Sequence, residues 1–196
     1  MYRINEIFYS LQGEGRHTGR AAIFIRMSGC NMRCPFCDTD FQSYREMSAE
    51  DIVAAIQPWK LCGFVVLTGG EPTLQVDASL VQALKAEGFY LAMETNGTGF
   101  VADGVDWVTY SPKDSFVEYA PKRLVQHVNE VKVIFDGVHD PSPYASIDAL
   151  HYLQPCDTGD EARNQEIVAQ CVAYIKQHPQ WQLSLQTQKL IKIPYK

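Results

Sequence analysis

The sequence predicts an α/β protein whose fold is an incomplete β/α barrel of about six parallel strands. Short apolar segments rich in β-branched and aromatic residues recur along the 196 residues, and each ends in a cluster of Gly, Pro, Ser or Asp. Helical patterns separate several of these segments, and apolar strands that alternate with helices are typical of a parallel sheet covered by helices. Six or seven strands are too few for a closed eight-stranded barrel, so we expect the barrel to be incomplete.

The expected strands, in chain order, are residues 22–27, 64–67, 90–93, 107–110, 131–135, 152–153 and 183–185. Each is followed by polar or turn-forming residues, such as Ser28-Gly29-Cys30 after the first strand and Thr68-Gly69-Gly70-Glu71-Pro72 after the second. The carboxyl ends of parallel strands lie on one face of an α/β fold, where ligands bind. We therefore expect these polar clusters to form a single site.

Three helices are expected between the strands. Ser48 can cap a helix that contains residues 52–56, because its hydroxyl can accept a hydrogen bond from an early backbone N–H group. Residues 77–87 have apolar side chains at three- and four-residue spacing, and Gly88 is a good helix stop. Residues 161–177 repeat this spacing. No repeat, low-complexity stretch or linker interrupts the pattern, so residues 1–196 are expected to form one domain.

Composition and charge restrict the function. Hydrophobic residues make up 46% of the chain and charged residues 20%, as in ordinary globular proteins. Seventeen basic and 23 acidic residues give a net charge of −6, which argues against general nucleic-acid binding. No apolar run approaches the roughly 18–20 residues of a membrane-spanning helix, and the residues after Met1 do not form a signal peptide. We expect a cytoplasmic protein that binds neither nucleic acid nor membrane.

Three of the six cysteines, Cys30, Cys34 and Cys37, are clustered in the pattern CxxxCxxC. Soft thiolates at this density suit an iron–sulfur cluster or zinc. A four-iron cluster takes four ligands, so three cysteines would leave one iron open to a small molecule. None of the five histidines has zinc-finger spacing from this loop, which disfavours zinc but leaves it open. Buried structural cysteines, or a thioredoxin-like redox pair of Cys34 with Cys37, would also agree with this spacing.

This motif, directly after the first expected strand, resembles that of the radical S-adenosylmethionine superfamily. The resemblance implies that the three cysteines hold a four-iron four-sulfur cluster whose open iron binds the amine and carboxylate of S-adenosylmethionine. An electron from the cluster would cleave the sulfonium and give a 5′-deoxyadenosyl radical. The barrel, in turn, would be of the radical S-adenosylmethionine type.

Residues 69–72 resemble the GGEP element of the same superfamily. Glycines permit close backbone approach there, and Glu71 offers an acceptor for the ammonium group of the cofactor. Together with the polar residues after later strands, this resemblance implies contacts to S-adenosylmethionine from Gly69, Gly70, Glu71, Gly97, Ser111, Pro112, Lys113 and Gln154.

Within the superfamily, the chain resembles over nearly its whole length the members that form 7-deazapurines. The matching segments are residues 4–15, 24–26, 28–30, 37–39, 94–97, 111–113, 154–155 and 186–187. This resemblance implies a ring contraction of 6-carboxy-5,6,7,8-tetrahydropterin with loss of ammonia, in the route to queuosine. It also implies a magnesium ion, a homodimer and a reducing protein partner such as flavodoxin.

The same resemblance implies substrate contacts from Leu11, Gln12, Gly13, Glu14, Arg26, Thr95 and Pro194. Arg26 would pair with the substrate carboxylate through both arms of its guanidinium group. Residues 11–14 would clamp the amide-like edge of the pterin, with the Glu14 carboxylate as an acceptor. Thr39 would help to hold magnesium, a hard cation that prefers oxygen ligands.

The carboxyl-terminal segment departs from the family pattern, which is close to QTHKxxGxP. Gln188 stands in place of the histidine, Lys192 stands in place of the glycine, and two residues follow Pro194. We therefore do not assign a terminal carboxylate to the substrate site. Two further functions stay open at this point: a glycyl-radical enzyme activase, which has the same cysteine spacing, and a non-catalytic zinc-binding module.

Overall fold

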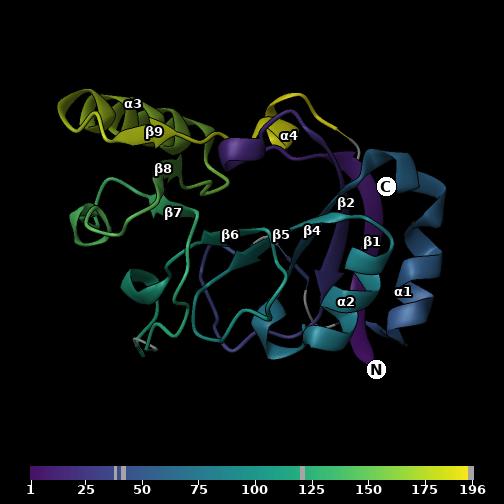
Figure 1. Ribbon diagram of the computed structural model, residues 1–196. Coiled ribbons are helices and arrows are strands. Elements are labelled where there is room, and N and C mark those ends of the chain that lie inside the picture. The colour runs from purple at the N-terminus through teal and green to yellow at the C-terminus, as the bar shows by residue number, and fades with distance from the viewer. Residues whose placement is uncertain (38, 41–42, 120–121, 194–196) are drawn as a thin grey trace.

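Figure 1 shows the computed structural model, which describes residues 1–37, 39–40, 43–119 and 122–193. Within these residues lies a nine-stranded sheet in the order β3-β1-β2-β4-β5-β6-β7-β8-β9. The strands are β1 (Tyr2–Leu11), β2 (Ala21–Met27), β3 (Arg45–Met47), β4 (Phe64–Gly69), β5 (Tyr90–Thr95), β6 (Trp107–Tyr110), β7 (Glu130–Phe135), β8 (Leu150–Pro155) and β9 (Trp181–Leu183). Strands β2 and β4 to β9 run parallel, whereas β1 pairs with both β2 and β3 in the antiparallel sense.

The expected fold class is confirmed, because the sheet is largely parallel and does not close into a full barrel. The first five parallel strands are those that the apolar segments predict, with small shifts at their ends. Strand β8 is longer than the expected residues 152–153, and β9 lies two residues before the expected residues 183–185. Strands β1 and β3 were not predicted. The register of β1 against β2 shifts between Ile4 and Glu6, so its side chains do not alternate regularly between buried and exposed positions. Because of this irregularity, the longest strand of the sheet lacks the alternation of apolar and polar residues that predicts a strand.

The three predicted helices are present. Helix α1 (Ala49–Ile56) begins with a capping box, in which Ser48 and Asp51 each accept a hydrogen bond from the other's backbone N–H group. Asp77 caps α2 (Ala78–Ala86), and Asp160 caps α3 (Glu161–Gln177). A short helix that was not predicted, α4 (Thr187–Leu190), follows β9. None of the helices in the described part of the chain is long and apolar enough to cross a membrane.

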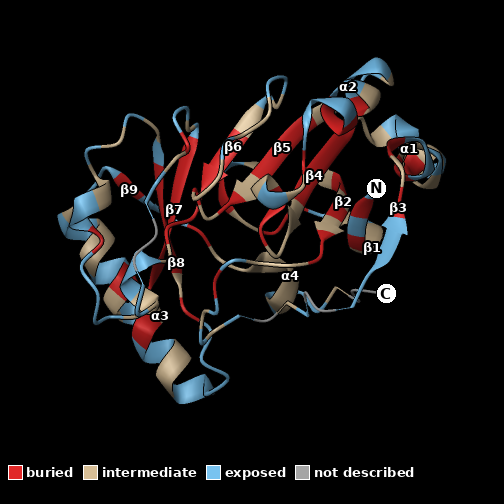
Figure 2. Ribbon diagram, turned by 90° about the horizontal axis from the view of Figure 1, so that it is seen from below, coloured by how far each residue is buried: buried red, intermediate tan, exposed pale blue. Residues whose placement is uncertain are grey.

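The sheet is curved, and its two faces differ in chemistry. Figure 2 shows an arc of strands with α1 and α2 outside one end, α3 outside the other, and α4 in the opening of the arc. Apolar side chains of the outer face, such as Ile25 on β2 and Val133 on β7, belong to the cores beneath these helices. Successive side chains of a strand point to opposite faces. Arg26, Glu94 and Lys132 therefore lie on the inner face, which carries charge.

A short 3-10 helix, η1 (Gly15–His17), closes the interior at the amino ends of the parallel strands. The ring of His17 lies 5.0 Å from that of Phe64 and 4.9 Å from that of Trp107, measured between centroids. Phe64 and Trp107 are the first residues of β4 and β6. Cys30, by contrast, follows the carboxyl end of β2. The cysteine loop and the segment around η1 thus approach the interior from opposite ends.

Candidate active site

The three clustered cysteines lie on the loop that follows β2. Cys30 and Cys34 are partly buried, Cys37 is exposed, and all three are free thiols. The Cys37 N–H group donates to the Cys34 carbonyl at 3.1 Å, and Cys30 Sγ accepts a hydrogen bond from the Met32 N–H group at 3.4 Å. Burial raises the pKa of the Cys30 and Cys34 thiols. At neutral pH these groups therefore need a bound metal centre to become thiolates.

The donor set of this loop fits an iron–sulfur cluster better than a single metal ion. Among the described residues, no three His, Cys, Asp or Glu side chains converge on a point that could hold one ion. Cys30, Cys34 and Cys37 nevertheless lie close enough to influence one another electrostatically. A cluster presents a separate iron to each thiolate, so its ligand sulfurs need not converge on one point. Three soft sulfur ligands on one short loop match this requirement.

The two glycines after β4 pack directly against the cysteine loop. A Cβ atom on Gly70 would lie 1.9 Å from the carbonyl oxygen of Gly29, and one on Gly69, whose φ is +124°, would lie 2.2 Å from the carbonyl oxygen of Met27. The Glu71 N–H group donates to the Gly29 carbonyl at 2.8 Å. The ends of β2 and β4 therefore form one backbone unit, and only glycine fits at residues 69 and 70.

The Glu71 carboxylate joins the end of β4 to the end of β5. Its Oε1 atom accepts hydrogen bonds from the Thr73 N–H group, the Thr73 hydroxyl and the Thr95 hydroxyl, at 3.0, 2.6 and 2.6 Å. Its Oε2 atom accepts from the Asn96 N–H group at 2.7 Å. Glu71 is 1% exposed. Oε1 thus has no acceptor site left for a ligand, whereas Oε2 accepts one hydrogen bond and can accept a second one from an ammonium group.

The loop after β5 contacts both the cysteine loop and β6. Asn31, between the first two clustered cysteines, donates to the Thr98 hydroxyl at 2.7 Å and accepts from the Asn96 amide at 3.0 Å. Gly97 has a φ of +80°, and a Cβ atom there would lie 2.4 Å from the Tyr110 ring. Glycine at residue 97 is therefore required by its backbone conformation and by the close approach of Tyr110.

Residues after β6 and near the end of β8 also reach this end of the interior. The Ser111 N–H group donates to the Thr95 carbonyl at 2.8 Å, and the Lys113 ammonium donates to the Ser111 carbonyl at 2.9 Å. Burial lowers the pKa of Lys113 to about 8, although the neighbouring Cys34, Glu94 and Glu14 favour its charged form. Pro112 and Gln154 are buried. The residues expected to bind the cofactor thus come from neighbouring strand ends.

The structure brings Arg26 and Thr39 together, although the sequence predicted different roles for them. Arg26 Nη1 lies 3.1 Å from Thr39 Oγ1, and Arg26 Nε donates to Glu6 Oε1 at 2.7 Å. The Arg26 side chain is 19% exposed. Glu6 therefore occupies one arm of the guanidinium group that was expected to bind a substrate carboxylate.

The expected substrate residues of the amino-terminal segment lie beside the interior, at the end where η1 is found. Leu11 ends β1 and pairs with Ala21. Gln12 donates to Glu94 Oε1 at 3.2 Å, and the Gly13 carbonyl accepts from the Thr187 N–H group at 3.1 Å. The Glu14 carboxylate lies in an ion pair with Lys132. The expected clamp is thus built into contacts with β5, β7 and α4.

Comparison with known proteins identifies the family. A model described as the radical SAM superfamily matches residues 24–123. A 7-carboxy-7-deazaguanine synthase of Bacteroides thetaiotaomicron is 45% identical over 98% of this chain and 99% of its own length. The chain belongs to the 7-carboxy-7-deazaguanine synthase family. The synthase of Caulobacter vibrioides is 41% identical, over 98% of this chain and 99% of its own length.

The fold agrees with that of a solved relative. The crystal structure of QueE from Escherichia coli matches with a TM-score of 0.73 and 31% identity, over 95% of this chain and 94% of that one. Membership of the synthase family decides the question that the cysteine motif left open. It favours neither the glycyl-radical enzyme activase nor the zinc-binding module.

Sequence analysis assigned no role to Lys132, a charged group in the interior, whereas Glu94 belongs to the segment 94–97 that was expected at the cofactor pocket. Lys132 is buried on β7, and Glu94 lies on β5 next to Thr95. The Thr95 hydroxyl, which was expected to touch substrate, donates to Glu71, whereas Glu94 faces the interior. One signal for Lys132 was present in the sequence, because a lysine in the apolar segment 131–135 has no place in a purely apolar core.

The departures of this chain from the synthase pattern have structural counterparts. Gln188 Nε2 donates to Glu14 Oε1 at 3.0 Å, so residue 188 contacts the expected substrate clamp. Lys192, which stands where the family has glycine, has a φ of +52° and thus keeps a backbone conformation that favours glycine. Pro194, an expected substrate contact, lies outside the described residues.

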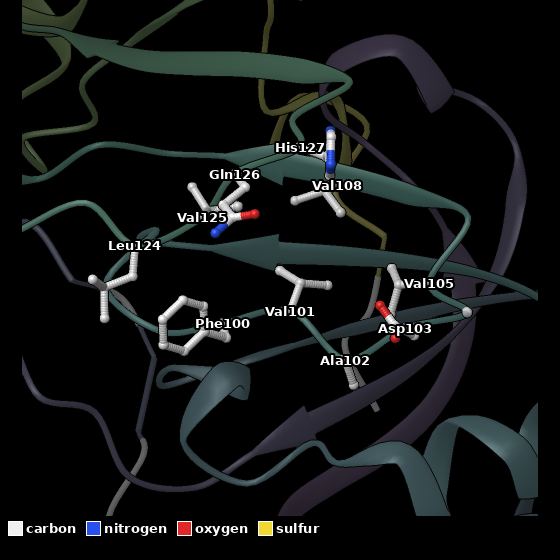
Figure 3. Close-up of a pocket in the computed structure, with 11 residues that line it drawn as sticks. Phe100, Val101, Ala102, Asp103, Val105, Val108, Leu124, Val125, Gln126 and His127 are labelled. Carbon is white, nitrogen blue, oxygen red and sulfur yellow. The ribbon is translucent and has the colours of Figure 1, made fainter.

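A separate cavity of about 330 Å³ lies on the outer side of β6 and contains none of the expected site residues (Figure 3). Its lining includes Phe100, Val105, Val108 and Leu124. The neighbouring Trp107 points to the opposite face, where it packs against His17. The cavity is therefore distinct from the interior in which the charged residues gather.

Proposed function

We propose that this protein converts 6-carboxy-5,6,7,8-tetrahydropterin to 7-carboxy-7-deazaguanine with loss of ammonia, on the route to 7-deazapurines such as queuosine. The observation that carries this proposal is the 45% identity, over nearly the full length of both chains, to a protein named for this product. The three free thiols on one loop after β2 supply the ligands that a radical S-adenosylmethionine enzyme needs.

The cofactor set follows from the superfamily. Cys30, Cys34 and Cys37 would hold a four-iron four-sulfur cluster, and S-adenosylmethionine would bind beside it. When bound, these groups supply a 5′-deoxyadenosyl radical that can take a hydrogen atom from the substrate. The protein's part is to bind, orient and shield the reactants.

The S-adenosylmethionine site proposed here is the set of strand ends next to the cysteine loop. Its expected members are Gly69, Gly70, Glu71, Gly97, Ser111, Pro112, Lys113 and Gln154. Gly70 packs closely against Gly29, so the strand ends present backbone without side chains at this point. A small ligand can approach such a backbone closely, which supports the proposed site. Glu71 fixes the relative positions of the Thr95 hydroxyl and the Asn96 N–H group.

The substrate site proposed here lies between that set and the η1 end. Arg26 would bind the substrate carboxylate in competition with Glu6, and residues 11–14 would meet the pterin ring. Thr39 Oγ1, which lies against Arg26, is the expected protein ligand of a magnesium ion. A magnesium ion there would add positive charge to the side that receives the carboxylate.

The wider biochemical setting is also part of the proposal. The chain would act as one domain and as a homodimer, and it would receive electrons from a reducing protein such as flavodoxin. A cytoplasmic location suits six cysteines that are all free thiols.

The proposal is tested by anaerobic reconstitution with iron and sulfide, followed by assay with S-adenosylmethionine, dithionite and carboxytetrahydropterin. We expect about four iron and four sulfide atoms per chain, and formation of the deazaguanine product by mass spectrometry. Cys34→Ala removes one of three cluster ligands and should abolish both the cluster and turnover. Cys62→Ala is the matched control, because Cys62 lies outside the loop and bonds the Ala21 carbonyl.

Two outcomes would contradict the proposal. One is protein that holds zinc but neither iron nor sulfide after anaerobic purification. The other is a Cys34→Ala variant that keeps its activity.

A further inference from the structure

Lys132 is a buried cation between two carboxylates in the interior of the sheet. Its Nζ atom lies 2.5 Å from Glu14 Oε2 and 3.0 Å from Glu94 Oε2. The Lys132 side chain is 5% exposed, whereas those of Glu14 and Glu94 are 17% and 20% exposed. The cation is thus enclosed, and both carboxylates keep a surface towards open space.

The surroundings of Glu14 fix its carboxylate in one position. Its Oε1 atom accepts hydrogen bonds from Gln186 at 3.1 Å and from Gln188 at 3.0 Å, and its Oε2 atom binds Lys132. Burial alone would raise the pKa of Glu14, but Lys132 and these hydrogen bonds lower it to about 2. Glu14 is therefore a fixed, ionised acceptor across the physiological pH range.

An unpartnered acceptor lies beside this group. Gln188 Oε1 is buried, and no group among the described residues donates a hydrogen bond to it. A Cβ atom on Gly13 would lie 1.6 Å from the same oxygen, so it sits directly against the expected clamp. A buried carbonyl without a donor is costly unless a ligand or water supplies one. The Glu14 region thus offers acceptors, which fit a ligand edge rich in N–H groups.

We propose that Lys132 is a positioning residue for substrate, which holds Glu14 so that its carboxylate accepts N–H groups of the aminopyrimidinone edge of the pterin. This inference rests on the proposed function, and it goes further by assigning a role to a residue of β7 that touches no substrate itself. Lys132 also separates Glu14 from the like charge of Glu94. Without the cation, the two carboxylates would repel each other.

The same arrangement predicts a change in pH dependence when the cation is lost. The charged groups that act on Lys132 are Glu14, Glu94 and Glu130, together with Lys113. In a Lys132→Gln variant, the Glu14–Glu94 pair should take up a proton more readily, so substrate affinity should fall as pH falls. A lysine that only stabilised the fold would not produce this pH profile.

The experiment measures binding of the stable analogue 6-carboxypterin by its fluorescence. At about pH 6, we expect Lys132→Gln to bind the analogue roughly ten- to a hundredfold more weakly than the unaltered protein, with part of the affinity regained at about pH 8. Lys132→Arg keeps the charge and should restore a flat pH profile. Lys85→Gln breaks a surface ion pair with Asp106 and is the matched control, with unchanged binding.

Turnover supplies a second readout. Lys132→Gln should raise the KM for the pterin while it leaves the KM for S-adenosylmethionine and the visible absorption of the cluster unchanged. Glu14→Gln should cause a similar loss of analogue binding, and it provides the test if Lys132→Gln does not fold. The double variant should lose no more affinity than either single variant, because the two residues act as one unit.

The inference would be overturned by a folded Lys132→Gln variant with the affinity and pH profile of the unaltered protein, by additive losses in the double variant, or by analogue binding that Glu14→Gln leaves intact. Failure of the proposed function is distinguishable from all three. In that case the unaltered protein itself would neither bind carboxypterin nor turn over the tetrahydropterin.

Discussion

Glu130, at the start of β7, is 2% exposed, and its Oε2 atom accepts a hydrogen bond from the Arg16 N–H group at 3.0 Å. Burial and the nearby Glu94 raise the pKa of Glu130 to about 7, above its ordinary value of 4.5. The folded state thus holds this proton more tightly than the unfolded state. The contribution of this protonated carboxyl group to the stability of the folded state is fully present below about pH 4.5 and is lost as pH rises through about 7.

A Glu130→Gln variant removes this titration and keeps an oxygen that can accept from Arg16. Urea unfolding at two pH values should show that the variant gains stability relative to the unaltered protein between about pH 5 and pH 8, by on the order of 2–3 kcal/mol. Glu87→Gln is the control with a flat profile: the hydrogen bond from Lys60 lowers the pKa of Glu87 below its ordinary value of 4.5, so its stability difference should stay nearly constant between about pH 5 and pH 8. A Glu130→Gln variant whose stability difference does not change with pH would refute this account.

At the scale of elements, the ends of β2 and β4 are joined so closely that one added methyl group should separate them. Gly70→Ala would bring a Cβ atom to 1.9 Å from the Gly29 carbonyl oxygen and 3.1 Å from the Cys30 nitrogen. We expect the cysteine loop to shift, with a loss of about 1–3 kcal/mol in stability and a lower iron content after reconstitution. Chemical unfolding and iron analysis measure the two effects.

Gly88→Ala is the control for the element-scale prediction. Gly88 follows α2 with a φ of +84°, and a Cβ atom there would meet nothing within 4 Å. That variant should lose about 1 kcal/mol through backbone strain and keep its full iron content. Equal iron content in the Gly70→Ala and Gly88→Ala proteins would show that the packing of β4 does not support the cluster loop.

Elements with local signals were predictable from the sequence, whereas elements that depend on distant partners were not. Ser48 and Asp77 cap helices through hydrogen bonds to backbone N–H groups three residues further along the chain. A few neighbouring residues of the sequence are therefore enough to predict these helix starts. Helix α4 is four residues long, and its first residue donates to Gly13, far away in the chain. Its existence therefore follows from tertiary contacts.

At the scale of the whole molecule, the sequence indicated which strand ends meet but not what fills the space between them. The carboxyl-end clusters were predictable, because all parallel strands end on one side. The Lys132–Glu14–Glu94 group joins β7, the segment after β1, and β5 across long sequence separations. No pattern of neighbouring residues encodes that pairing. The opposite placement of residues 11–17 and the cysteine loop likewise follows from the antiparallel course of β1, which was not predicted.

Gly13, which follows β1, and Gln188 of α4 meet in the interior, and the last prediction tests whether this contact shapes the substrate site. Gly13→Ala would place a Cβ atom 1.6 Å from Gln188 Oε1 and 2.9 Å from the Gln188 backbone nitrogen, so α4 would have to move. Residues 184–193 should then exchange amide hydrogens faster, and 6-carboxypterin should bind about tenfold more weakly, with iron content unchanged. Gly63, directly before β4, also has a positive φ (+64°), and a Cβ atom there has no neighbour within 4 Å, so Gly63→Ala should leave both properties as they are. Unaltered exchange over residues 184–193 in Gly13→Ala would show that the carboxyl-terminal segment adapts without loss, and the contact between Gly13 and Gln188 would then have no part in shaping the site.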